Sequence, residues 1–428
     1  MSATNARGKR TALLVGGLSA TMVVSMAISG ATAAPKPSPK PTLNNAACPA
    51  SPGVTATTIA VGAVFPRSVA GYRGFDTAAQ LRIAQENAKG GINGRKIVLT
   101  TYDDAANPAT QVTVANKAVQ QDNMFGLISA STTDTMYPTL KVANIPVVGL
   151  ANVPAYTNDR NAFGTQGPWL PELSSTSLFQ KFKDAGVTSV ALVNHNSPGA
   201  IAAAAGAVAT FPLVGVPIGL KINDLPIGTY DATSTVLRFK NAGVDGIYSV
   251  LLPEGGVSIG QANQQQNFKP KAFYVPALTD PGTIAKAPGP LEGVFSSPYI
   301  GKPVGVNVPA VRTYANGMKA AGLNPYLNFA PVGFIAADEF LLGLKKAGTC
   351  PTRQSFIDGL RTVKSYDANG FLPSKFSYAP TVLSPLGGPV NPTKSCAWYV
   401  TVKGGQPVPD AAPTCGRTYN IKTNQFVG

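Results

Sequence analysis

The chain has 428 residues, of which 13% are charged and 44% hydrophobic, a composition typical of a packed globular protein and unlike that of a disordered one. Its formal net charge is +15, but the basic residues are scattered and do not cluster with aromatic side chains, which argues against a nucleic-acid partner. The first 33 residues contain three basic and no acidic residues, so their removal would leave +12, a surplus suited to adhesion to an anionic envelope.

The amino terminus has the pattern of a secretory signal peptide. Basic residues between Arg7 and Arg10 precede an apolar run over residues 12–28, and small residues up to Ala33 form a cleavage signal. We predict cleavage after Ala33, followed by an exposed Pro/Lys-rich spacer over residues 34–53. Because no cysteine stands at the cleavage point, we expect an exported protein, secreted or held in a periplasm-like space, without a lipid anchor.

After the spacer, apolar strand patterns alternate with helix patterns. In chain order the sequence predicts strand 57–64, helix 75–91, strand 96–104, helix 109–121, strand 124–130, helix 134–143, strand 145–150, helix 171–185, strand 188–196, helix 200–210, strand 217–224, helix 232–242, strand 246–252, a Gln-rich helix, strands 271–276 and 292–300, and a late helix 334–347. Such alternation predicts parallel sheets built by right-handed crossovers, and the length suits two of them.

In an open parallel sheet, the loops at the carboxyl ends of the strands form the ligand crevice. The predicted loops are rich in Ser, Thr, Asn and Gly, and they read FPRSVAGYRG, SASTTD, LANV, NHNSPG, LLPEGG and PALTD. Their hydroxyls and amides suit polar or anionic ligand groups, although each residue also fits helix capping.

The stretch IAVGAVFPRS, followed by GINGRKIVLTTYDDAANPATQVTVANKAV, ISASTTDTMYP and IPVV, resembles the type I periplasmic binding proteins. The similarity is to the leucine/isoleucine/valine family, which delivers solutes to ABC importers, and it extends from about Val54 to Gly405. The resemblance implies an α/β fold of two doubly wound parallel-sheet domains joined by a three-segment hinge. It further implies a ligand in the cleft between the domains, a membrane permease as partner, no cofactor and no catalysis.

The resemblance also divides the chain. We expect domain I to comprise residues 54–166 and 300–380, domain II residues 167–299 and 381–428, and the crossovers to lie near residues 164–171, 297–303 and 380–392.

Two adjacent acids, Asp103 and Asp104, end the strand 96–104 and raise the question of a metal or catalytic pair. Further ligands at metal-binding spacing are lacking nearby. We therefore predict that the pair closes the strand–helix turn and caps the helix that starts near Asn107.

Members of this family bind an α-amino acid through a characteristic set of side chains, and only part of that set is present in this sequence. In the loop after the third strand, Ser129, Ser131 and Thr132 supply hydroxyls, while Ala130 stands where a ligand serine is expected. In the next loop, which begins with Ala151, Asn152 replaces a threonine and keeps the capacity to hydrogen-bond.

The groups expected from the second half diverge more. The family's late-helix tyrosine corresponds to Phe334, an expected aromatic is replaced near Leu252, and the acid that would neutralise an ammonium falls near Ala277. Without that acid a buried ammonium ion would cost several kcal/mol, unless Glu254 or Asp280 substitutes, and helix capping explains those two acids equally well.

Four further residues are candidate contacts. Phe65 and Arg67 lie in the loop after the first strand, where Arg67 either binds an acid group or is an exposed loop arginine. Trp169 either walls the cleft or packs at the hinge, and His195 either contacts ligand or is hydrogen-bonded within its loop. From the whole set we expect a small, largely apolar ligand, with a simple carboxylate preferred to a branched-chain amino acid.

Two alternatives remain open at this point. The string GVSIG around Ser258 matches the nucleophile elbow of a secreted serine hydrolase, but the only histidine, His195, precedes the serine, which is the wrong order for such hydrolases. The second alternative is a ligand-binding module that serves sensing instead of uptake.

The four cysteines lack the close spacing of a zinc site, and export favours disulfides. We predict Cys396 to Cys415, which bracket a strand-like segment, and Cys48 to Cys350. The second pairing follows from the implied fold: the start of the first strand lies at the pole far from the cleft, and the helix 334–347 runs from the cleft to that same pole.

Overall fold

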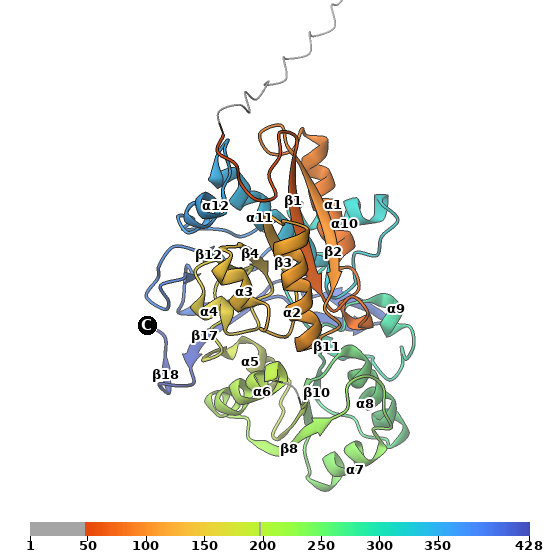
Figure 1. The fold of residues 1–428 in the computed structure, drawn as a ribbon. Helices are drawn as coiled ribbons and strands as arrows, with labels where there is room; N and C mark the ends of the chain where they lie inside the picture. Colours follow the sequence, from red (N-terminus) through yellow and green to blue (C-terminus); the bar gives the residue numbers. More distant parts are fainter. Residues whose placement is uncertain (1–47, 197) are drawn as a thin grey trace, which may run out of the picture. The chain divides into compact units, whose positions relative to one another are not determined.

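The computed structural model describes residues 48–196 and 198–428, so the predicted signal peptide and most of the predicted spacer lie outside the described residues. Five parallel strands form the first sheet in the order β2-β1-β3-β4-β5 (Figure 1). They are β1 (Thr58–Phe65), β2 (Lys96–Asp103), β3 (Gly126–Ser129), β4 (Val147–Gly149) and β5 (Ala162–Gly164). This is a doubly wound order, in which the direction of winding reverses between β1 and β3.

Helices cover both faces of this sheet because the side chains of β1 alternate between two cores. Ile59, Val61 and Ala63 pack in one core, and Val64 packs in the other. The first core is closed by α1 (Phe75–Ala88), α10 (Pro309–Ala320), α11 (Ala330–Ala347) and α12 (Arg353–Leu360). The second is closed by α2 (Pro108–Asn116), α3 (Tyr137–Val142) and α4 (Ala155–Asn158).

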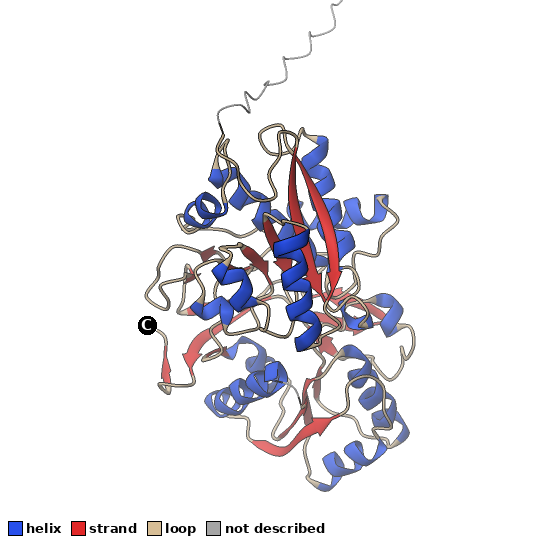
Figure 2. Cartoon of the chain, viewed as in Figure 1, coloured by secondary structure: helices blue, strands red, loops and turns tan. Residues whose placement is uncertain are grey.

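The second sheet repeats the same order in its parallel part, β8-β7-β9-β10-β11. Its strands are β7 (Val190–His195), β8 (Ile218–Leu225), β9 (Gly246–Val250), β10 (Ala272–Tyr274) and β11 (Phe295–Ser296). Leu192 faces a core shared with α5 (Thr176–Asp184) and α6 (Pro198–Thr210). Val193 faces a core shared with α7 (Thr233–Asn241), α8 (Pro253–Gln265) and α9 (Pro281–Ile284). Figure 2 shows the helices flanking the strands.

The carboxyl-terminal residues add antiparallel strands, of which the sequence analysis foresees only the strand-like segment between Cys396 and Cys415, where β15 (Val400–Lys403) lies. β15 pairs antiparallel with β11, and β16 (Gln406–Pro409) extends the same edge. A separate antiparallel sheet joins β6 (Leu173–Ser175), β14 (Lys394–Ala397), β17 (Thr414–Asn420) and β18 (Gln425–Phe426), and β12 (Phe376–Ser377) pairs with β13 (Gly388–Pro389). An antiparallel edge on a mostly parallel sheet is common in such folds.

The chain passes between the two sheets three times: after β5, after β11, and between α12 and β15. The predicted fold class, two doubly wound sheets joined by three segments, is therefore confirmed. Within the described part of the chain, no helix combines the length and the apolar character needed to cross a bilayer.

One predicted helix is shorter than expected. The helix predicted over residues 171–185 begins only at Thr176, because Leu173–Ser175 pair with β17 as strand β6. The Ser175 side chain then caps α5 by accepting a hydrogen bond from the amide of Ser177 at 3.2 Å.

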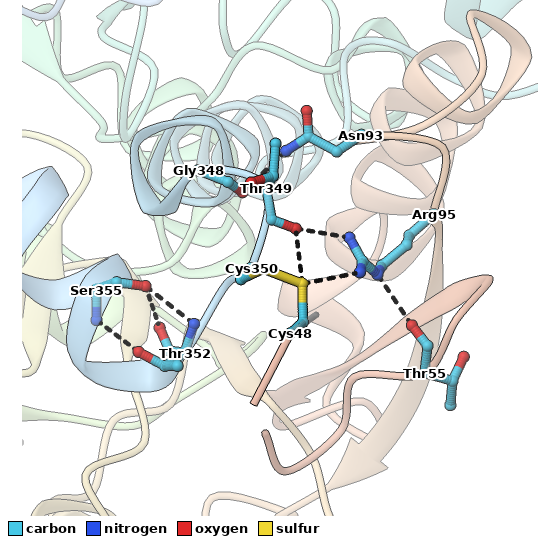
Figure 3. The surroundings of a disulfide bond; sticks show 9 residues. All are labelled: Cys48, Thr55, Asn93, Arg95, Gly348, Thr349, Cys350, Thr352 and Ser355. Atoms are coloured by element: carbon cyan, nitrogen blue, oxygen red, sulfur yellow. Dashed lines mark hydrogen bonds between the residues drawn. A yellow bond between two sulfur atoms is a disulfide. The ribbon is translucent and has the colours of Figure 1, made fainter. Parts of the chain in front are cut away.

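A disulfide joins Cys48 to Cys350 at the start of β1, and this is the pair favoured by the sequence analysis (Figure 3). The Cα atoms are 5.2 Å apart, and the neighbouring Arg95 donates from Nε to the Thr55 carbonyl and from Nη1 to the Thr349 carbonyl, each at 2.9 Å. The bond and the guanidinium together tie the amino end of the first sheet to the end of α11.

The second disulfide, Cys396 to Cys415, lies across the paired strands β14 and β17. The two residues are directly opposite in the strand register, with Cα atoms 4.0 Å apart. This bond therefore fastens the carboxyl-terminal sheet locally and not across domains.

Candidate functional site

The carboxyl ends of both sheets carry the loops that the fold makes available for binding. The winding reverses between β1 and β3 in the first sheet and between β7 and β9 in the second, and ligands of doubly wound sheets bind beside such reversals. The relevant loops follow Phe65, Ser129, His195 and Val250.

Asp103 and Asp104 close the end of β2 but do not cap α2, which corrects the sequence-based prediction. Asn107 is the cap, and its side chain accepts from the amides of Ala109 and Thr110. Asp103 instead accepts from the Ser68 amide at 3.1 Å, which fixes the loop after β1. Backbone and side-chain hydrogen bonds of this kind outweigh the effect of burial, and the pKa of Asp103 is lowered.

Asp104 is fully buried and fixes the loop after β3. Its Oδ2 accepts from the Ser131 hydroxyl, and Gln111 Nε2 lies 2.5 Å from Ser131 Oγ and 3.4 Å from the carboxylate. Gln111 also donates to the Thr133 carbonyl at 2.8 Å. The Ser131 hydroxyl therefore donates its hydrogen bond to a group of the protein itself, as part of a polar network that positions the loop after β3.

The other predicted contacts in this loop are of two kinds: Ser129 and Ala130 are buried, and Thr132 is exposed. Ser129 is fully buried, and its Oγ accepts from the Ser131 amide at 3.2 Å. Ala130 is buried and donates its amide to the Val64 carbonyl at 3.1 Å. Thr132, by contrast, is exposed and interacts with the hydroxyl of Tyr72.

Three aromatic side chains meet where the loops of the first sheet reach the second crossover. Tyr72, in the short helix η2 (Ala70–Tyr72), lies with its ring centroid 4.2 Å from that of Phe329, and Phe329 lies 5.1 Å from Tyr299. Tyr72 and Tyr299 keep part of their surface exposed, yet burial raises the pKa of Tyr72 to about 12 and raises that of Tyr299 as well. Tyr299 also lines a small cavity near the second crossover.

The loop after β9 in the second domain approaches the loop after β1 in the first domain. A methyl group placed on Gly71 would lie 3.8 Å from Cδ1 of Leu252. His195 fixes that loop: its Nδ1–H donates to the Leu225 carbonyl at 3.1 Å, and its Nε2 accepts from the Leu252 amide at 2.9 Å. Both ring nitrogens are thus used, and His195 positions Leu252.

Ala277 lies near the second crossover in an unusual backbone conformation. Its φ is +57°, in the left-handed region, and its amide donates to the Ser297 carbonyl at 2.8 Å. A cavity of about 20 Å³, enough for one water molecule, is lined by Ala277, Tyr299 and Asn328, among others. Asn328 Oδ1 is buried without a hydrogen-bond partner among the described residues.

Two more polar groups of the first domain's loops are shielded from solvent and unpartnered within the described part of the chain. They are Thr133 Oγ1, in the loop after β3, and Asn152 Oδ1, in the loop after β4. Ala151 packs at the edge of the core that contains α2, α3 and α4.

The remaining predicted contacts lie outside this group. Phe65 packs on Phe75 in the core with ring centroids 5.1 Å apart, and Phe334 packs 5.1 Å from Tyr314. Trp169 lies against the core that contains α2, α3 and α4. Arg67 pairs with Asp76 at 3.4 Å on an exposed surface.

The serine of the hydrolase alternative is not in a nucleophile elbow. Ser258 lies inside α8, buried, where its hydroxyl donates to the Glu254 carbonyl at 3.2 Å and accepts from the Tyr230 amide at 3.1 Å. An elbow requires a sharp strand-to-helix turn that exposes the hydroxyl, so the GVSIG match is coincidental.

A hollow of about 400 Å³ occurs elsewhere, lined by Phe268, Lys269, Lys271 and neighbours at the amino end of β10. Since the loops that bind ligands lie at the opposite ends of the strands, this hollow is not part of the candidate site. Within residues 48–196 and 198–428, no group of three or more His, Cys, Asp and Glu could hold a metal ion.

One carboxyl group of α11 is buried without an ion pair among the residues that the structure describes. Glu339 in α11 is fully buried, and neither of its oxygens has a well-aligned hydrogen-bond partner among the described residues. Burial raises the pKa of Glu339 well above its usual value, although Tyr378 and the charge of Arg361 oppose the shift. The carboxyl group is therefore neutral over a range in which an exposed glutamate is ionised.

This raised pKa predicts a pH dependence of stability. Between the unfolded pKa of 4.5 and the higher folded pKa, the unfolded chain releases a proton that the folded chain keeps, so the stability contributed by Glu339 is present below 4.5 and is lost as pH rises. Glu339→Gln removes this loss. We expect the unfolding free energy of the variant to gain on the wild type by about 1.4 kcal/mol per pH unit between pH 5 and the raised folded pKa of Glu339, measured by urea titration at several pH values.

Glu172→Gln, at a partly exposed glutamate, is the control for the change from carboxyl to amide. Parallel stability profiles for the wild type and Glu339→Gln would show that Glu339 is ionised in the folded protein.

The sequence profile of the periplasmic binding protein family matches residues 58–406. A curated Leu/Ile/Val-binding protein homologue from Brucella melitensis is 27% identical over 47% of this chain and 55% of its own length, and the chain spans about half or less of the curated relatives it matches.

Among solved structures, a fatty acid ABC transporter substrate-binding protein from Thermomonospora curvata is similar with a TM-score of 0.70 and 17% identity, covering 90% of this chain and 98% of that one. A branched-chain amino acid transporter substrate-binding protein from Streptococcus pneumoniae, in complex with isoleucine, is similar with a TM-score of 0.67 and 15% identity, covering 84% and 100%.

The match of the family profile spans both sheets and the loops at their carboxyl ends, and the solved structures named above share the fold over nearly their whole length. These neighbours are substrate-binding proteins and not enzymes, in keeping with the interior position of Ser258. With its two doubly wound sheets and three connecting segments, the chain belongs to the periplasmic binding protein family.

Proposed function

We propose that this protein captures a small, largely apolar organic ligand between its two domains, closes on it by hinge motion, and delivers it unchanged to an ABC importer. The observation that carries the proposal is the aromatic group of Tyr72, Phe329 and Tyr299, together with the close approach of Gly71, next to Tyr72, to Leu252 of the second domain. Aromatic side chains supply a large apolar contact area, and the hydroxyls of the tyrosines can orient a polar group of the ligand.

The moving parts in this proposal are residues 54–166 with 300–380 and residues 167–299 with 381–428. We propose that hinge motion is absorbed near residues 164–171, 297–303 and 380–392, which belong to the three parts of the chain that pass between the sheets. A ligand that contacts both domains stabilises the closed arrangement over the open one.

The ligand class is supported by the site and by the neighbours. One similar structure is a fatty acid transporter substrate-binding protein and another is in complex with isoleucine, and both ligands have an apolar chain and a carboxylate. We therefore propose a small carboxylate or a hydrophobic amino acid, taken up outside the cytoplasm and passed to a membrane permease.

A ligand screen by thermal unfolding tests the proposal. Ligand at 100 times its dissociation constant stabilises the folded state by about 2.7 kcal/mol, so small apolar carboxylates or hydrophobic amino acids should raise the Tm by several degrees. Tyr72→Ala removes the ring that stacks on Phe329 and should abolish most of this shift.

Val142→Ala is the matched control, because Val142 is 91% exposed on α3 and lies outside the site. A shift that survives in Tyr72→Ala, or no shift with any member of either ligand class, would contradict the proposal.

A further inference from the structure

The hollow at the amino end of β10 has the size of a site for a small molecule. Its volume is about 400 Å³, and ligand pockets of proteins span about 300–1,000 Å³. Its wall is formed by the carboxyl-terminal turns of α8, by residues 268–273 at the start of β10, and by residues 289–294 before β11. All three segments belong to the second sheet and its connections, so the hollow is separate from the loops around Tyr72.

One buried polar side chain in this wall lacks a partner in the described part of the chain. Asn263, in α8, is 5% exposed, and its Oδ1 is shielded from solvent and accepts no hydrogen bond from a described residue. The backbone carbonyl of Asn263, in contrast, accepts from the Phe268 amide at 2.8 Å and closes the end of the helix. An amide oxygen buried without a donor is costly, and such groups in native proteins are completed by a water molecule or by a ligand.

Two neighbouring side chains of the wall can donate hydrogen bonds into the hollow. Gln264 reaches from α8 toward the opposite wall, since a methyl group placed on Gly289 would lie 3.6 Å from its Nε2. Lys269 is exposed just before β10 and forms no ion pair with a described residue, so its ammonium group is available to a ligand.

The other charged groups of the wall are used by the protein itself. Lys271 Nζ pairs with Asp245 at 2.8 Å, and the Glu292 carboxylate accepts from the Gly404 amide at 3.0 Å. These contacts hold the wall in place, and they leave the amide oxygen of Asn263 and the two donors available.

The ligand group that satisfies this wall must both donate and accept hydrogen bonds. A carboxylate accepts from Lys269 but has no hydrogen for Asn263 Oδ1, and an ammonium group donates to Asn263 but is repelled by Lys269. A hydroxyl group donates one hydrogen bond and accepts others, so several hydroxyls on one molecule serve Asn263, Gln264 and Lys269 together. The ring of Phe268 and the side chain of Pro270, in the same wall, offer apolar surface to the C–H groups between those hydroxyls.

We propose that this hollow is a second ligand site, which binds a small neutral polyhydroxy molecule of the size of a single sugar ring. One hydroxyl donates to Asn263 Oδ1, and others accept from Gln264 and Lys269. This inference goes beyond the proposed function, because the site lies at the opposite ends of the strands and takes a different chemical class of ligand from the apolar molecule proposed for the loops around Tyr72.

Probes that share a cyclohexane ring test the chemistry of the site. The polyol myo-inositol carries a hydroxyl on every ring carbon, whereas cyclohexanecarboxylate and cyclohexylammonium each carry a single charged group. In amide NMR spectra of the purified protein, myo-inositol should shift the resonances of Phe268, Lys269 and Gly293 with a Kd in the millimolar range. The two charged probes should leave these resonances unshifted, even if the carboxylate binds at the loops around Tyr72.

Variants of the wall test which residues bind the probe. Gln264→Ala and Lys269→Ala each remove one donor and should weaken the binding of myo-inositol about fivefold, and Asn263→Leu removes the acceptor and should abolish the shifts. Gln261→Ala is the matched control and should keep the wild-type Kd, because Gln261 is an exposed glutamine of the same helix outside the wall. Because Gln264 and Lys269 are exposed, their variants keep the fold and decide the question even where Asn263→Leu does not fold.

The outcomes separate this site from the proposed function. Absence of shifts with myo-inositol, or a Kd unchanged in the wall variants, overturns the second site. Tighter binding at these resonances of either charged probe, or of N-acetylglycinamide as a model of a peptide group, overturns the assignment to a polyhydroxy ligand. None of these results bears on the proposed uptake of an apolar ligand, which Tyr72→Ala tests with other compounds.

Discussion

Arg361→Met is expected to lower the free energy of unfolding by about 3–5 kcal/mol, because three carbonyl groups lose their donor in a buried setting. The guanidinium donates to the carbonyls of Arg160, Ala162 and Leu386 at distances from 2.6 to 3.1 Å. It also lies 4.0 Å over the ring of Phe163. Burial disfavours the charged guanidinium and lowers the pKa of Arg361 to about 10. The hydrogen bonds to the three carbonyls offset this desolvation cost.

The contacts of Arg361 join the end of the first sheet to the third connecting segment, since Ala162 begins β5 and Leu386 lies between β12 and β13. Hydrogen exchange in Arg361→Met should therefore rise first near Leu386. Arg361→Lys keeps a charge but cannot form the fork, so its loss should be intermediate.

Urea unfolding with an unchanged m-value measures the effect, and Arg238→Met, at an exposed arginine on α7, is the control. A loss below 1 kcal/mol in Arg361→Met would mean that water satisfies the three carbonyls.

Removing the disulfide between Cys48 and Cys350 should cost about 5–6 kcal/mol, more than removing the one between Cys396 and Cys415. The two bonds close sequence separations of 302 and 19 residues, and a longer closed loop restricts the unfolded chain more. The expected cost of the shorter bond is about 3 kcal/mol.

The measurement compares the double variants Cys48→Ser with Cys350→Ser and Cys396→Ser with Cys415→Ser by urea unfolding. Equal losses would contradict the loop-length argument. In the first variant Arg95 also loses its contact with Cys48 Sγ, while its bonds to the Thr55 and Thr349 carbonyls remain to hold the pole together.

The alternating strands and helices could be predicted because buried parallel strands form short apolar runs, and the structure confirms the doubly wound fold. The Cys48–Cys350 pairing was predicted from the fold that the family resemblance implies, in which the start of the first strand and the end of the late helix lie at the same pole, and the structure confirms it. Of the strands β12 to β18, only β15 was foreseen, as the strand-like segment between Cys396 and Cys415. The others were missed because they are short and lie among many prolines and glycines.

The site was less predictable than the fold. The position of a residue in the sequence identifies its loop, but it does not tell whether the side chain is free for a ligand or hydrogen-bonded within the protein. Ser131 and His195 lie in the expected loops, yet the side chains of both form hydrogen bonds with other groups of the protein. Tyr72 was overlooked within the quoted loop FPRSVAGYRG, although an aromatic among small residues after the first strand is a usable signal. Phe329 and Tyr299 become neighbours of Tyr72 only through the tertiary fold.

The late return of β15 to the edge of the second sheet has a consequence for how the chain acquires its structure. β11 is complete at Ser296, but the strand that pairs with its outer edge is Val400–Lys403, about one hundred residues later. The core on one face of the first sheet likewise needs α11 and α12, which come late in the chain. A nascent chain thus cannot finish either half from a continuous stretch of its sequence. Such distant pairings slow folding, so truncation before Val400 should leave a polypeptide with an open strand edge that is prone to self-association.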